Sequence, residues 1–164
     1  MYNIGDIIVH PMHGAGTIES ITSKNIDGKE LEYYTLKLPT NNMTVMVPVA
    51  TSGNIGIHSV MSAERADELL ALIPKTEIDD IVNWNRRYRE NTAKLKTGNP
   101  EDVIVVIKSL AYRELKTGLS TGERKILHTA RQILFSEVAL AKNIDYKTLE
   151  AMVDEILDKS LKNT

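Results

Sequence analysis

The spacing of hydrophobic residues changes once along this chain, near residue 60, and this change limits the possible folds more than any other feature. Before it, hydrophobic residues come in short runs separated by turn residues, as in "DIIVH" at 6–10 and "MTVMVPV" at 43–49. After Ser62 they recur at the three- and four-residue intervals of amphipathic helices. We therefore predict an α+β chain, with a strand-rich domain over residues 1–58 and an all-helical domain over residues 59–164.

The first domain is predicted to be a small barrel. Asp27-Gly28 is a dipeptide favoured in tight hairpin turns, because both central turn residues need positive φ. The imperfect alternation of "TIESIT" at 17–22 indicates a twisted or bulged strand, and Pro48 indicates an edge strand or a strand end. Several short strands in so short a segment are typical of a β-barrel of the SH3 or Tudor type.

Start and stop signals predict the helices of the second domain. Capping side chains, a proline in the first turn and glycines after the last turn mark the boundaries. Helices are expected from Ser62 to Pro74, from about Trp84 to Thr97, from Asn99 to Gly118, after the capping box at 120–123, and after Asp145.

Composition argues against several classes of protein. The chain has no cysteine, which excludes disulfides, thiolate metal sites and thiol catalysis. No apolar run approaches the ~20 residues needed to span a bilayer, and the N-terminus lacks the pattern of a signal peptide. We therefore expect no membrane contact and a cytoplasmic location. Because the net charge is only −2, any binding to DNA must come from local patches.

Signals for catalysis are weak. His10 and His13 flank a turn without a nearby cluster of carboxylates, so they fit turn histidines better than metal ligands. Asp79 and Asp80 are adjacent, and in a helix their side chains would point apart by about 100°. The chain also lacks a phosphate-loop lysine after its glycine-rich stretches and a Gly-x-Ser-x-Gly elbow. We expect no enzyme activity, no cofactor, no metal and no small-molecule substrate.

Trp84, the only tryptophan, allows two interpretations. In a helix it shares a stripe with Ile81 and Tyr88, which fits a residue of the core. It also follows Asn83, a good helix cap, and precedes three arginines in "NWNRRYREN" at 83–91. A side chain at a helix start can project beyond the helix, which fits a surface contact.

Several motifs together resemble the CarD/CdnL family of bacterial transcription regulators that bind RNA polymerase. They are "GDIIVHPMHGAGTIESI" at 5–21, "LEYYTLKL" at 31–38, "MTVMVPV", "NWNRRYREN" and "GLSTGERKILHTARQIL" at 118–134. The first motif is less specific, because transcription–repair coupling factors share that polymerase-interaction module. The resemblance implies a Tudor-like domain on the polymerase β subunit and a helical domain on promoter DNA. It implies a regulator without catalytic activity that stabilises the open promoter complex, with the tryptophan as a wedge in the minor groove at the upstream edge of the bubble.

The resemblance also implies which residues make these contacts. The implied contacts with RNA polymerase are Lys24, Ile26, Thr44, Met46 and Val47. The implied contacts with DNA are Trp84, Arg86, Arg87, Arg89, Arg124 and Lys125. The residues alone leave alternatives open: Met46 could fill the barrel core, and Arg124 and Lys125 could be ordinary surface charges.

The helical domain carries equal numbers of basic and acidic side chains. We therefore expect weak, salt-sensitive binding to free DNA, which tethering through the first domain would strengthen. The main rival hypothesis is a protein–protein adaptor on RNA polymerase that makes no DNA contact.

Overall fold

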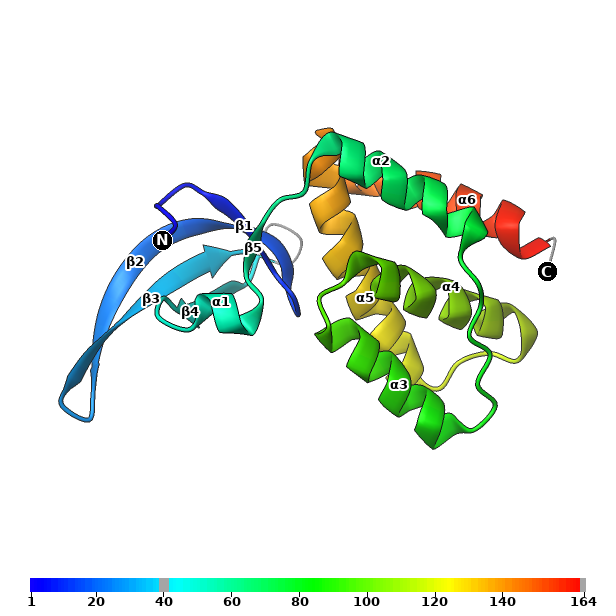
Figure 1. Cartoon of the computed structure of the whole chain (residues 1–164), viewed down its shortest axis with the longest axis horizontal. Helices are drawn as coiled ribbons and strands as arrows, with labels where there is room; N and C mark the ends of the chain where they lie inside the picture. The colour runs from blue at the N-terminus through cyan, green and yellow to red at the C-terminus, as the bar shows by residue number, and fades with distance from the viewer. Residues whose placement is uncertain (39–41, 163–164) are drawn as a thin grey trace. The chain divides into compact units, whose positions relative to one another are not determined.

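The computed structural model describes residues 1–38 and 42–162. The chain divides into two compact units, Met1–Val60 and Met61–Thr164 (Figure 1). The first unit is a β-sheet and the second is built of helices, which confirms the predicted α+β class. No helix in the described part of the chain combines the length and the apolar character needed to cross a membrane.

The first unit is a single antiparallel sheet with the strand order β4-β3-β2-β1-β5. Figure 1 shows β2 and β3 as a long, twisted hairpin. Pairing among the described residues leaves β4 and β5 as the two edges of the sheet. The barrel-like module is therefore a curved sheet that stays open between these two strands. The elements are β1 (Ile7–His10), β2 (Gly14–Ile26), β3 (Lys29–Lys37), β4 (Thr44–Pro48), the short helix α1 (Ser52–Ile55) and β5 (His58–Ser59).

The hairpin turn and the strand irregularity lie where the sequence predicts them. Asp27 has φ 52° and Gly28 has φ 80°, and the flanking residues Ile26 and Lys29 are paired. Two consecutive residues with positive φ are what a tight turn between right-twisted strands requires. The register of β2 against β3 shifts between Ile18 and Ser20, as expected of a bulge. The predictions for the turn and for a bulged strand are therefore confirmed.

One face of this sheet carries the core of the first unit. Ile18, Tyr34, Leu36 and Val47 come from three adjacent strands, and each is at most 1% exposed. The Tyr34 hydroxyl accepts a hydrogen bond of 3.0 Å from the backbone N–H of Tyr2, so its polar end is satisfied. Because side chains alternate between the two faces of a strand, the opposite face of the hairpin is left to solvent.

The second unit contains five α-helices and a short 3-10 helix among the described residues. The side chains of Ser62, Asn83, Asn99 and Ser120 each accept a hydrogen bond from a backbone amide in the first turn, which confirms the predicted starts. The elements are α2 (Ala63–Leu72), η1 (Ile73–Lys75), α3 (Trp84–Lys96), α4 (Pro100–Lys116), α5 (Thr121–Lys142) and α6 (Tyr146–Lys162).

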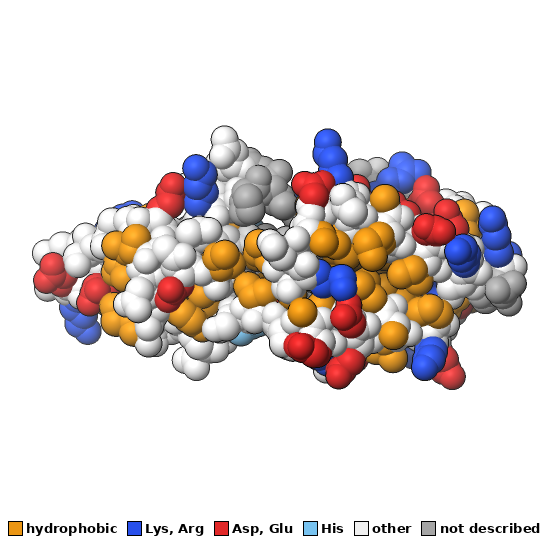
Figure 2. Space-filling model, turned by 90° about the horizontal axis from the view of Figure 1, so that it is seen from above, with side chains coloured by type: hydrophobic (Ala, Val, Ile, Leu, Met, Phe, Trp, Pro, Cys, Tyr) orange, Lys and Arg blue, Asp and Glu red, His pale blue; other side chains and the backbone are white. Residues whose placement is uncertain are grey.

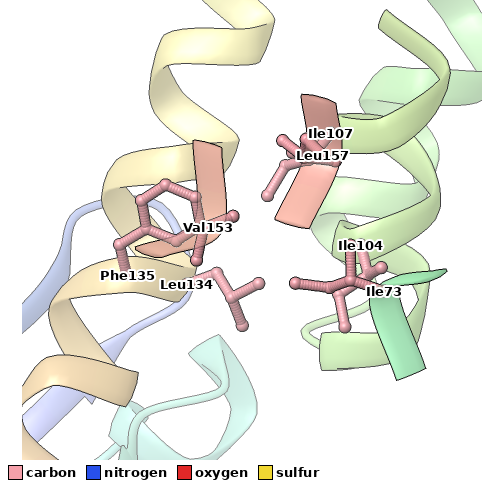
Figure 3. Close-up of a pocket in the computed structure, with 7 residues that line it drawn as sticks. All are labelled: Ile73, Ile104, Ile107, Leu134, Phe135, Val153 and Leu157. Atoms are coloured by element: carbon pink, nitrogen blue, oxygen red, sulfur yellow. The ribbon is translucent and has the colours of Figure 1, made fainter. Parts of the chain in front are cut away.

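The core of the second unit is closely packed and apolar. Figure 3 shows a small pocket between α4, α5, α6 and η1, into which only hydrophobic side chains point. The pocket has no room for a water molecule and no polar group to bind one. The pocket is therefore part of the packed core and not a ligand site.

Gly16 provides a test of strand packing in the first unit. A Cβ atom on Gly16 would lie 2.7 Å from the backbone oxygen of Lys37, which belongs to the neighbouring strand. We expect Gly16→Ala to destabilise this unit by about 1–3 kcal/mol, because the strands must move apart. Urea unfolding followed through the amide NMR signals of β2 measures this effect.

The matched control is Gly53→Ala in α1, where an added Cβ meets no atom within 4 Å. Its free energy of unfolding should equal that of the wild type or exceed it by up to about 1 kcal/mol, because alanine is the better helix former. The fluorescence of Trp84 reports the second unit in the same samples and should be unchanged. Equal stability of the two variants would contradict the close approach at Gly16.

Candidate nucleic-acid interface

Helices α3 and α5 begin side by side and run in the same direction (Figure 1). Two contacts define their register: Trp84 binds Ser120, and Arg87 binds Glu123. Each pair is separated by 36 residues in the chain, and the second pair follows the first by one helical turn. Two parallel helices with adjacent starts place both positive dipole ends at the same edge of the unit. This edge favours anionic partners.

Trp84 lies at the first position of α3 and is not sealed in the core. Its side chain is 45% exposed. One side of the indole stacks on Tyr88, with ring centroids 5.2 Å apart and planes inclined by 22°. The indole Nε1–H donates a hydrogen bond of 3.1 Å to the Ser120 hydroxyl. The ring is thus held on one side and open to solvent on the other.

Arg87 has a different role from the predicted DNA contact. It is 5% exposed, and its Nε and Nη2 donate to the two carboxylate oxygens of Glu123 at 2.6 and 3.0 Å. Its Nη1 donates to the carbonyl oxygens of Ile81 and Val82. Since these bonds hold the guanidinium inside the protein, phosphate cannot reach it without disrupting the core. The structure therefore corrects the prediction for Arg87, which links α3 to α5.

The pair also shifts the ionisation of both partners. The hydrogen bond from Arg87 holds the pKa of Glu123 below its ordinary value, although burial acts in the opposite direction. The hydrogen bond to Glu123 raises the pKa of Arg87. Hydrogen bonds from the Ser120 backbone and hydroxyl also lower the pKa of Glu123. Both groups therefore stay charged at neutral pH.

The segment between η1 and α3 is tied to α4 over most of its length. Lys108 is 3% exposed, and its Nζ donates to the carbonyl oxygens of Ile73, Pro74 and Thr76. Farther along, the Ser109 hydroxyl accepts from the backbone N–H of Asp79 at 2.9 Å. These bonds join α4 to backbone groups of η1 and of the segment that follows it, and they restrict the path of the chain toward Trp84.

The four remaining predicted DNA contacts are exposed. Arg86 and Arg124 are each 63% exposed, and their ion-pair partners, Glu90 and Glu114, lie 3.3 and 3.9 Å away. Arg89 and Lys125 are also exposed. Surface pairs of this kind contribute little, so they leave the cations accessible to phosphate. On the face of the helical unit drawn in Figure 2, basic and acidic side chains are interspersed.

In the first unit, the strand register separates the predicted polymerase contacts into two groups. The exposed face of the sheet carries Lys24, Ile26, Thr44 and Met46. Their partners in β3 all stand at alternate positions of that strand, so the four side chains point to the same face. Val47 lies on the opposite face and is 1% exposed. The structure therefore corrects the prediction for Val47, whose side chain belongs to the core. Met46 is 40% exposed and is not a core filler.

Two further residues extend this exposed face. Leu31 pairs with Lys24 and is 40% exposed, which adds a hydrophobic side chain to the face that carries Ile26 and Met46. Lys24 Nζ lies 6.0 Å from the centroid of the Tyr33 ring. The sequence placed both residues in a strand, but only the register shows that they share a face with the predicted contacts.

The two histidines of the first turn lie against one another. Their ring centroids are 4.6 Å apart, and the backbone N–H of Met12 donates to His10 Nδ1. Burial lowers the pKa of His10 to about 4, and the neighbouring His13 acts in the same direction. Within the described residues, no group of three or more potential metal ligands comes together.

Comparisons with known proteins cover both units. Residues 2–61 match the family model described as "CarD-like/TRCF RID domain", and residues 68–154 match "CarD, C-terminal domain". The chain belongs to the CarD/CdnL family. It is also 33% identical over 151 residues to "Putative transcription factor YdeB" of Bacillus subtilis (strain 168), covering 92% of this chain and 99% of that protein. The CarD-type chain is thus a transcription regulator of a family that is not an enzyme family, and its first domain is of a type that interacts with RNA polymerase.

Sequence reasoning missed the residues that hold the tryptophan of this CarD-type protein. Ser120 and Glu123 were recognised only as a capping box, and Tyr88 only as a neighbour of Trp84 on one helical stripe. The box does form, because Ser120 Oγ accepts from the backbone N–H of Glu123. No local pattern connects these residues to Trp84 and Arg87, since the contacts span 36 residues.

Glu123→Gln tests the importance of the buried pair. It leaves the Arg87 charge without a charged partner, so we expect a loss of about 3 kcal/mol in the free energy of unfolding at pH 7. The control is Glu114→Gln, which removes an exposed carboxylate and should cost less than about 1 kcal/mol. Urea unfolding monitored by Trp84 fluorescence measures both variants.

The same comparison has a defined pH dependence. The pKa of Glu123 is lowered in the folded state from an ordinary value of 4.5. Its contribution to the free energy of unfolding is therefore complete above pH 4.5. The contribution is lost as pH falls through the folded-state pKa. The difference between wild type and Glu123→Gln should therefore shrink in acid. A constant difference down to the acid transition would contradict the assignment.

Proposed function

We propose that this CarD-type regulator binds the β subunit of RNA polymerase and stabilises the open promoter complex with Trp84. The observation that carries the proposal is the position of this ring, half exposed where two parallel helices begin. An aromatic wedge needs an apolar ring face that can contact DNA without unfolding of the protein. The proposed partners place the protein in the bacterial cytoplasm.

The energetics favour the opened form of the DNA. Inserting an apolar side chain at a base step costs a few kcal/mol of lost stacking. This cost is smallest at the upstream edge of the bubble, where the duplex is already opening. Contact between a base and an aromatic ring returns about 1–3 kcal/mol. Trp84 would therefore bind the open form more tightly than the closed form, and this difference in affinity shifts the equilibrium.

The surroundings of Trp84 favour the minor groove and its phosphates. The dipoles of α3 and α5 add positive potential at this edge, and α3 has no acidic residue in its first turn. Arg86, Arg89, Arg124 and Lys125 are exposed and are proposed to contact the backbone of the promoter. Such contacts position the wedge without reading the base sequence.

The exposed face of the first unit is proposed as the surface that docks on the polymerase. It combines the cations Lys24, Lys29 and Lys37 with the exposed hydrophobic side chains of Ile26, Leu31 and Met46. Thr44 lies on the same face of the edge strand β4. A methionine at this position suits an adaptable apolar contact. Docking raises the local concentration of the helical unit at the promoter, which compensates for its lack of net positive charge.

Trp84→Ala tests the wedge. We expect the equilibrium between open and closed promoter complexes to fall about fivefold to a hundredfold, which corresponds to the lost contact between ring and base. Promoter-opening and dissociation kinetics with RNA polymerase measure the change. Binding of the variant to polymerase alone should be unchanged.

The control for Trp84→Ala is Met152→Ala, which removes a comparably exposed hydrophobic side chain from α6. It should leave promoter opening at the wild-type level. Thermal unfolding of both variants separates a loss of stability from a loss of contact. An adaptor without DNA contact would instead show lower stability and normal promoter opening for Trp84→Ala.

Lys24→Glu combined with Met46→Ser tests the docking surface. Reversing the charge and removing the apolar side chain should weaken binding to RNA polymerase about thirtyfold, as for a central interface position. Titration of the full chain against polymerase measures the affinity. Lys147→Glu makes the same charge change on exposed surface of α6 and should bind normally. Unchanged binding of the double variant, with its fold intact by NMR, would reject this surface.

A further inference from the structure

The Ser120 hydroxyl is the point where the exposed indole meets the buried ion pair. Its oxygen lies 3.1 Å from Trp84 Nε1, 3.2 Å from the backbone nitrogen of Glu123 and 3.2 Å from Glu123 Oε1. A serine hydroxyl offers one donor and two acceptor positions. These three contacts therefore use its full capacity.

The direction of each of these bonds follows from the partners. The indole N–H and the backbone N–H can only donate, so Ser120 Oγ accepts from both. The Glu123 carboxylate is ionised and can only accept, so the Ser120 O–H donates to it. No rotation of the hydroxyl would improve one bond without breaking another. The arrangement therefore defines where the indole N–H can point.

The remaining contacts of the indole restrict its other motions. Tyr88 covers one face of the ring, and the edge of Tyr88 lies against Gly122 at the start of α5. A Cβ on Gly122 would lie 3.3 Å from Tyr88 Cε2, so the lack of a side chain at this position lets the tyrosine lie there. Glu123, which orients the Ser120 hydroxyl, is itself fixed by two hydrogen bonds from Arg87.

We propose that Ser120 is a positioning residue that holds the Trp84 indole in its DNA-ready orientation before the promoter arrives, with Arg87 and Glu123 acting through it. This inference rests on the wedge function proposed above. A side chain that is already ordered loses less conformational entropy on binding than a free one. Ser120 thus increases the affinity of the wedge without touching DNA.

Ser120→Gly tests the proposal in the free protein. Glycine is also accepted at helix starts at a cost of a few tenths of a kcal/mol, so α5 should still form while Trp84 loses its acceptor. Since Trp84 is the only tryptophan, its fluorescence reports this site alone. We expect lower fluorescence anisotropy and faster quenching by acrylamide, and Ser120→Thr, which keeps the hydroxyl, should restore both. Ser62→Gly changes the matching cap of α2 and should leave both signals at wild-type values.

A double-mutant cycle tests whether Ser120 affects the open promoter complex through the indole N–H of Trp84. Ser120→Gly should shorten the lifetime of the open complex about twofold to tenfold, as expected for one hydrogen bond. Trp84→Phe keeps an aromatic ring but has no N–H to be held. In the Trp84→Phe background, Ser120→Gly should therefore cause no further loss. An equal loss in both backgrounds would overturn the proposal, since Ser120 would then act without the indole.

A replacement within the ring removes the risk that a Ser120 variant misfolds. Growth with 3-benzothienylalanine in place of tryptophan changes position 84 alone and replaces the N–H by sulfur. The open-complex lifetime should drop as with Ser120→Gly. A wild-type lifetime for the benzothienyl protein under conditions where Trp84→Ala impairs promoter opening would overturn the proposal, and so would unchanged Trp84 anisotropy and quenching in Ser120→Gly. If Trp84→Ala leaves promoter opening unchanged while Ser120→Gly mobilises the indole, the positioning stands and the wedge function fails.

Discussion

The buried ion pair between Arg87 and Glu123 is the interaction on which the arrangement of the candidate site depends. It joins the first turns of α3 and α5, and its spare donors fasten the carbonyl groups of Ile81 and Val82 before α3. A buried pair of this kind gains little stability over a hydrophobic pair of similar size, because desolvation offsets the Coulomb attraction. Its contribution here is geometric: it sets the register of two helices so that Trp84 lies beside Ser120.

The helical unit combines a fixed backbone with an open aromatic face. Lys108 and Ser109 of α4 hold the segment before α3, and Ser120 and Tyr88 hold the indole from one side. Trp84 nevertheless stays 45% exposed. This combination suits a wedge, because insertion then requires neither local unfolding nor a search among rotamers. The electrostatic attraction is correspondingly local, since the unit as a whole carries no excess of basic side chains.

The sheet unit shows how strand register decides between core and contact surface. Met46 and Val47 are neighbours in β4, yet one is 40% exposed and the other 1%. The alternation of side chains across a strand forces this division, and a shift by one residue would exchange their roles. From the sequence, the strand was predictable but its inward face was not, because "MTVMVPV" is hydrophobic at nearly every position. Pairing of β4 with Tyr34 and Leu36 of β3 decides the matter.

The sequence by itself determined the elements whose causes are local. Helix starts at Asn83 and Ser120, and the turn at Asp27-Gly28, follow from capping and from backbone φ preferences within a few residues. It also determined the family, through motifs spread over both units. Only the tertiary structure decided that Arg87 is buried, because its partner lies 36 residues away. Charge alone cannot distinguish a solvated arginine from one that meets a carboxylate on another helix. That choice depends on how the helices pack.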